Sequence, residues 1–86
     1  MRKPVVAGRF YPQDRQELAN AVDIMLSGKA VKRGAWGIIS PHAGYVFSGN
    51  CAGLAVQALP EEAPDTVVLL GPNHTGAGQP ISVSDE

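Results

Sequence analysis

The amino-acid sequence predicts an α/β fold in which a β–α–β unit belongs to a mostly parallel sheet with flanking helices. Two short apolar runs, "WGIIS" at 36–40 and "TVVLL" at 66–70, have the length and β-branched content of strands that are buried on both faces. A helical pattern at 49–59 separates them. A strand, a helix and a strand in this order form a right-handed crossover with parallel strands in nearly all proteins.

The N-terminal region predicts an extended arm over residues 1–12, followed by a helix over about 14–27. Asp14 suits the N-cap position, and Glu17 stands three residues later, as in a capping box. Gly28 is placed to end the helix in a left-handed conformation. The apolar residues recur at helical spacing and predict one buried face: Leu18, Val22, Met25 and Leu26.

The second helix is expected over about 49–59, with Ser48 as its N-cap and Pro60 just beyond its end. Small residues along it would let it lie close to a sheet. Cys51 is interpreted as a small buried hydrophobic residue rather than a ligand or nucleophile. The segment 81–84 is a candidate third strand. The predicted packing residues of this helix are Cys51, Ala52, Ala55, Val56 and Leu59.

Length and composition limit the possible classes of protein. Eighty-six residues with a net charge of −1 fit a single domain over 1–86, and the seven basic residues form no stripe that would indicate nucleic-acid binding. The single cysteine excludes an intrachain disulfide and a multi-cysteine zinc motif. No apolar stretch approaches the ~20 residues of a membrane span, and the first residues lack the apolar core of a signal peptide. We therefore expect no membrane partner and a cytoplasmic location.

The two histidines of the chain both follow predicted strands. His42 lies two residues after the end of the run at 36–40, and His74 lies four residues after the run at 66–70. Parallel strands end at one edge of a sheet, where open α/β folds bind ligands, so the two imidazoles could converge there. Imidazole is the commonest protein ligand of late first-row metals, which predicts a metal site that still needs a carboxylate or thiolate. The alternative is that each histidine only organises its own loop through backbone hydrogen bonds.

Several neighbours of His42 are further candidates for the site. Tyr45 would orient a substrate or donate a proton there, or act only as a packing aromatic residue. Ser48 opens a predicted helix whose N–H groups would suit an anion, although a plain N-cap explains the residue equally simply. The segment "GRFYP" would place Arg9 and Tyr11 over the site or serve as a structural arm. The loop "GPNHTGAG" lacks the Lys-Ser/Thr of a P-loop and the GxGxxG of a dinucleotide fold.

Three motifs, "AGRFYP", "PHAGYVFSG" and "LLGPNH", occur in this order and together resemble the Memo family, also called AmmeMemoRadiSam system protein B. The resemblance covers the chain from about Val5 to Ser84. It implies a fold related to the class III extradiol ring-cleaving dioxygenases, which use non-haem iron. It also implies that His42 and His74 are metal-site residues for iron (Fe²⁺) or copper, with a redox or dioxygenase-like role.

The chain departs from the family in its length. Family members are considerably longer, and the resemblance implies that further ligands, including a cysteine, lie in their later part. No residue here matches them, and Cys51 does not stand in for that cysteine. We therefore expect an incomplete domain whose sheet needs the remainder of the domain or a homo-oligomer to cover it. The alternatives are a non-enzymatic module that binds a peptide, small molecule or anion, and an inactive truncated product.

Overall fold

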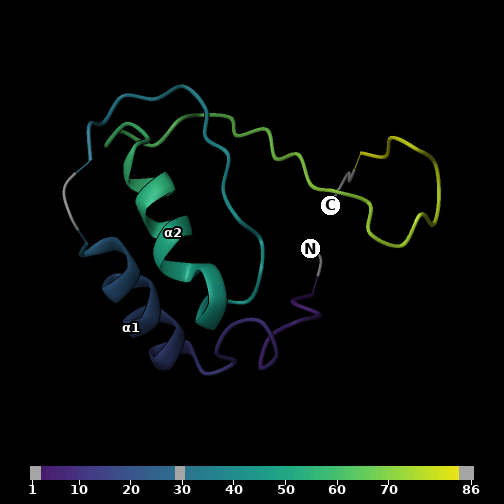
Figure 1. The fold of residues 1–86 in the computed structure, drawn as a ribbon, viewed down its shortest axis with the longest axis horizontal. Coiled ribbons are helices and arrows are strands. Elements are labelled where there is room, and N and C mark those ends of the chain that lie inside the picture. Colours follow the sequence, from purple (N-terminus) through teal and green to yellow (C-terminus); the bar gives the residue numbers. More distant parts are fainter. Residues whose placement is uncertain (1–2, 29–30, 84–86) are drawn as a thin grey trace.

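The computed structural model describes residues 3–28 and 31–83, and within them the chain forms two helices. Helix α1 spans Arg15–Leu26 and helix α2 spans Tyr45–Gln57. The two helices pack side by side. The chain after α2 extends away from them as an irregular segment (Figure 1). Neither of these helices is long and apolar enough to cross a membrane.

Helix α1 begins where its capping residues predict. Asp14 is the N-cap, and its Oδ1 accepts hydrogen bonds of 2.9 Å from the backbone N–H groups of Gln16 and Glu17. Two of the amide groups that a helix start leaves without an internal partner are thereby satisfied. A local signal of this kind needs no tertiary contact, which is why the sequence predicts it well.

The end of α1 differs from the prediction. Ser27 is the C-cap, and both its backbone N–H and its Oγ donate to the carbonyl of Ile24, at 3.2 and 2.8 Å. The predicted left-handed conformation of Gly28 is wrong, because Gly28 is not among the glycines with positive φ. The serine closes the last turn itself, so the helix needs no left-handed residue to end.

Helix α2 begins four residues before the predicted start, so the predicted N-cap role of Ser48 is wrong. Gly44 is the N-cap, with φ −55° and ψ 154°, and makes no side-chain capping bond. Instead, the backbone N–H of Tyr45 donates to the carbonyl of Phe10 in the N-terminal arm, at 2.8 Å. Ser48 lies inside the helix, where its Oγ donates to the carbonyl of Ala43 at 3.1 Å. A contact that is distant in sequence thus decides where α2 starts.

The face that α2 presents to α1 consists of Gly49, Gly53 and Gln57, the buried residues of this helix. They recur every four residues and therefore lie on one side of it. A Cβ atom on Gly49 would stand 2.7 Å from the Sδ of Met25, and one on Gly53 would meet the Met25 backbone. Gln57 donates from Nε2 to the Met25 carbonyl at 3.4 Å. The glycines therefore let the two helix backbones approach closely.

The predicted packing residues of α2 are only partly enclosed. Ala52, Ala55 and Leu59 are half-buried. The interpretation of Cys51 as buried is wrong, because its side chain is exposed. The side chains predicted to face a sheet have no sheet to contact in this part of the chain.

The predicted strands at 36–40 and 66–70 are not formed. The described residues contain no strand, and their one isolated bridge joins Ala7 to Tyr11. Trp36 is 104% exposed and Leu70 is 95% exposed, and no hydrophobic residue in the described ranges is buried. A strand exists only when a neighbour completes its hydrogen-bond ladder, and here no second segment does so. Residues 81–83 are also irregular, and Ser84 lies outside the described residues.

Candidate functional site

The two histidines come together although the described residues, 3–28 and 31–83, form no sheet. The Nε2 atoms of His42 and His74 lie 2.9 Å apart, and the ring centroids are 5.1 Å apart with 37° between the ring planes. Both side chains are exposed. The structure therefore places the two imidazoles against each other, tip to tip, from loops that are 32 residues apart in sequence.

A turn built on Asn73 shapes the backbone around His74. The Oδ1 atom of Asn73 accepts from the backbone N–H of Gly76 at 2.9 Å and from the Oγ1 of Thr75 at 3.3 Å. Its Nδ2 donates to the carbonyl of Ala77 at 3.0 Å. Gly76 has φ +66°, which few residues other than glycine adopt without strain. The sequence "NHTGA" thus folds into a compact turn by its own side chains.

His42 is held by the start of α2. It stands two residues before the N-cap Gly44, and the side chain of Ser48 bonds back to Ala43 between them. Gly44 is itself buried against the arm, where a Cβ atom would stand 3.3 Å from the carbonyl oxygen of Phe10. The loop that carries His42 is therefore tied to a helix at one end.

The separation of the two nitrogens allows two chemical arrangements. With one Nε2 protonated and the other bare, the contact is a hydrogen bond of ordinary length. With both bare, the nitrogens could bind one ion. Two imidazole nitrogens at about 2.1 Å from an ion lie about 3.0 Å apart when the bonds meet at a right angle, and about 3.4 Å apart at a tetrahedral angle. The observed 2.9 Å equals the spacing of a right-angled pair of ligands, but ring centroids 5.1 Å apart place the two rings nearly in line, so each ring would have to turn to bind one ion.

Two histidines do not complete a metal site. Within residues 3–28 and 31–83, no group of three or more His, Cys, Asp or Glu side chains could hold a metal ion together. The donor set fits late first-row metals by chemistry, but it supplies only two ligands.

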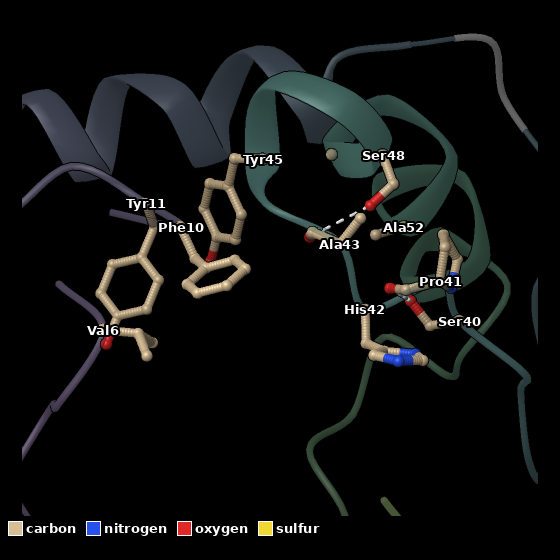
Figure 2. A pocket seen from close by; sticks show the side chains of 11 residues that line it. Val6, Phe10, Tyr11, Ser40, Pro41, His42, Ala43, Tyr45, Ser48 and Ala52 are labelled. Carbon is tan, nitrogen blue, oxygen red and sulfur yellow. Dashed lines mark hydrogen bonds between the residues drawn. The ribbon is translucent and has the colours of Figure 1, made fainter. Parts of the chain in front are cut away.

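An aromatic cavity adjoins His42 and was not predicted as a unit. The cavity measures about 480 Å³ and lies between the N-terminal arm, residues 40–43 and the first half of α2 (Figure 2). Phe10, Tyr11 and Tyr45 line it together. Arg9 does not line it; its guanidinium carbon lies 6.0 Å from the Phe10 ring centroid. The sequence signal was present in "GRFYP", but only the fold shows that Phe10 and Tyr11 of this segment line the cavity and that Arg9 does not.

The two other predicted site residues both contribute to this cavity. Tyr45 packs against Tyr11, with ring centroids 5.7 Å apart and 41° between the planes. Ser48 lines the cavity from α2, and its hydroxyl donates to the carbonyl of Ala43. An anion at the start of α2 would compete with the Phe10 carbonyl, which already takes the Tyr45 amide.

Comparison with known proteins decides the family. The family model described as "Memo-like protein" matches residues 2–86. The chain belongs to the Memo-like family. It is 45% identical over 87 residues to a MEMO1 family protein of Methanosarcina acetivorans, covering 100% of this chain and 32% of that relative. It is 46% identical over 86 residues to a MEMO1 family protein of Aquifex aeolicus, covering 96% of this chain and 31% of the relative.

This Memo-like chain spans about a third of the length of the curated relatives that it matches. A MEMO1 family protein of Nitrosopumilus maritimus shows the same proportion, with 40% identity over 89 residues and 32% of its length covered. No solved structure matches the chain. The names of these relatives give a family and state no ligand or reaction.

Proposed function

We propose that His42 and His74 are two ligands of an iron or copper site in a Memo-like protein. The remaining ligands would come from the rest of a Memo-like domain, outside this chain. In that complete domain, 36–40 and 66–70 would be parallel strands of an α/β sheet, and both histidines would leave its carboxyl edge. A redox or dioxygenase-like reaction is the role that we assign to such a site.

The single observation that carries the proposal is the 2.9 Å separation of the two Nε2 atoms. The residues come from separate loops, and each loop has its own support, the Asn73 turn on one side and the start of α2 on the other. Both imidazoles are exposed, so each could hydrogen-bond to water instead of to the other. Something must therefore favour their contact with each other over contacts with water. A shared ion is one such cause, and the spacing fits neighbouring ligands.

A bound ion would supply Lewis acidity and, as iron or copper, a change of oxidation state. The chain's own part is to present two imidazoles whose Nε2 atoms lie 2.9 Å apart. The proline before His42 fixes its own φ angle and so limits how far that loop can turn away. Ser48 lines the adjoining cavity on the same side as His42, and its hydroxyl oxygen is free to accept a hydrogen bond from a molecule there (Figure 2).

The test is a metal titration of the 86-residue chain by calorimetry, with Cu²⁺ in air and with Fe²⁺ under argon. The variants are His42→Ala, His74→Ala and the double variant, and Ser40→Ala is the control because it changes the same loop without removing an imidazole. Each single variant should weaken binding roughly tenfold or more, and the double variant should lose little beyond that, because one imidazole alone holds the ion weakly. Unchanged affinity in both single variants would remove the metal role.

The redox role needs its own measurement. Dioxygen consumption by the Fe²⁺-loaded chain is followed in an oxygen electrode with ascorbate as reductant, against the double histidine variant at equal iron. Consumption that depends on the histidines supports the redox role. Metal binding with equal consumption in both proteins would leave a metal-binding protein and refute the redox role.

A further inference from the structure

The loop that carries His74 is shaped by the side chains on either side of this histidine. The Oδ1 atom of Asn73 accepts from the backbone N–H of Gly76 at 2.9 Å, and its Nδ2 donates to the carbonyl of Ala77 at 3.0 Å. The hydroxyl of Thr75 donates to the same Oδ1 at 3.3 Å and accepts from the N–H of Ala77 at 3.2 Å. The side chains of Asn73 and Thr75 therefore hold the turn together, and the imidazole between them extends to the other histidine.

No backbone ladder supports this loop. In the part of the chain that the structure describes, no backbone-to-backbone hydrogen bond involves a residue between 60 and 83. The run that leads into the loop is irregular, and Leu70 at its end is 95% exposed. The shape of the loop around His74 therefore depends on its own side chains, whereas the loop of His42 is supported by the start of α2.

The turn requires an amide side chain at position 73. The N–H of Gly76 can only donate and the carbonyl of Ala77 can only accept, so the group between them must offer one acceptor and one donor. Asparagine carries both on its shortest possible side chain. Aspartate would offer acceptors alone, and glutamine would place the amide one methylene farther from the backbone. The identity of this residue therefore follows from the two backbone groups that it joins.

We infer that Asn73 and Thr75 are positioning residues, which fold the loop so that His74 meets His42. The two rings lie nearly in line, so each must rotate to share an ion, and the turn fixes the backbone of His74 without involving its ring. The inference deepens the proposed function and rests on it for the metal role of the histidine pair. The contact between the two imidazoles needs no metal and can be measured alone.

The first test measures this contact by NMR in the 86-residue chain, in a buffer with excess EDTA. The signal is the nuclear Overhauser effect between the ring protons of the two histidines. Asn73→Ala and Thr75→Val should lose it, whereas Thr75→Ser should keep it because serine retains the hydroxyl. Asn50→Ala and Thr66→Val are the matched controls, since they remove the same chemical groups outside the turn. Far-UV circular dichroism checks that α1 and α2 remain folded in every variant.

A pair of glycine variants tests the same turn through its backbone. Gly76 has φ +66°, which alanine adopts only with strain, whereas Gly71 is not among the glycines with positive φ. An added Cβ would meet no atom within 4 Å at either position, so the backbone conformation is what distinguishes the two substitutions. Gly76→Ala should weaken the signal between the histidines, and Gly71→Ala should leave it unchanged.

The second test repeats the Cu²⁺ titration without EDTA. Asn73→Ala and Thr75→Val should weaken binding roughly tenfold, as the loss of a residue that orients a ligand does, and no further than His74→Ala does. Thr75→Ser should bind like the parent chain. An affinity that falls in Asn73→Ala and Thr75→Val and is kept in Thr75→Ser supports the positioning role.

The NMR outcomes separate this inference from the proposed function. A parent chain without the signal, or an unchanged signal in both Asn73→Ala and Thr75→Val, overturns the inference even if copper binds through the histidines. An equal loss in the two matched controls also overturns it, because the contact would then respond to any substitution. Selective loss in the turn variants supports the inference even where the histidine variants leave metal affinity unchanged.

Discussion

Replacing Gly53 by alanine tests how closely the two helices pack, and Gly49→Ala is the matched control. Both glycines lie on the face of α2 that meets Met25 of α1. At Gly53 the added Cβ would meet the carbonyl oxygen of Met25 and would stand 2.8 Å from its carbonyl carbon. At Gly49 it would stand 2.7 Å from Sδ and 2.8 Å from Cε, the far end of a flexible side chain.

The expected magnitudes follow from these contacts. Both substitutions gain the same helix propensity, about 1 kcal/mol for alanine over glycine, so the gain cancels when the variants are compared. Gly53→Ala must also push the backbone of α1 away, and overpacking of this kind costs about 1–3 kcal/mol. Gly49→Ala requires only a new rotamer of Met25. We expect Gly53→Ala to be less stable than Gly49→Ala by about 2 kcal/mol.

The assay is a urea titration of both variants and the parent chain, followed by the helical signal in far-UV circular dichroism. The two variants should differ in their transition midpoints, with Gly49→Ala close to the parent. Equal midpoints, or a higher midpoint for Gly53→Ala, would refute the close approach of the helix backbones at Met25.

Two further substitutions probe features that lie far from the helix contact. Asp14→Ala removes the oxygen that accepts from Gln16 and Glu17, and should lower the stability of α1 by about 1 kcal/mol in the same urea assay, whereas Asp14→Asn should restore most of the loss. Glu61→Ala breaks the 3.5 Å ion pair with Arg33, whose two side chains are 79% and 49% exposed. An exposed ion pair of this kind stabilises a protein little, so the free energy of unfolding from the urea titration should change by no more than about 0.5 kcal/mol. A larger loss would show that the pair orders the loop.

The sequence predicts those features that depend on neighbouring residues. Asp14 caps α1 through amides two and three residues away, so its role follows from local chemistry. The start of α2 depends on the carbonyl of Phe10, which lies 35 residues before Tyr45, and no local pattern contains that contact. Small residues were expected to let α2 lie close to a sheet; in the structure Gly49 and Gly53 instead let it lie close to α1.

In the candidate site, too, some features could be predicted from the sequence and others depend on contacts between distant residues. The convergence of His42 and His74 was expected from a β–α–β topology, and the two rings do meet, although the strands of that topology are not formed in the described residues. The aromatic cavity was missed because Tyr11 and Tyr45 were weighed separately. Their contact depends on how the N-terminal arm folds back onto α2, which is a tertiary property.

The exposed run at 66–70 has a consequence for the behaviour of the chain at high concentration. The four consecutive apolar residues from Val67 to Leu70 are 65–95% exposed. In the described structure their backbone N–H and C=O groups form no strand-to-strand hydrogen bonds. An apolar segment in this condition is a template for intermolecular β-pairing. Whatever covers this run therefore also protects the chain from aggregation.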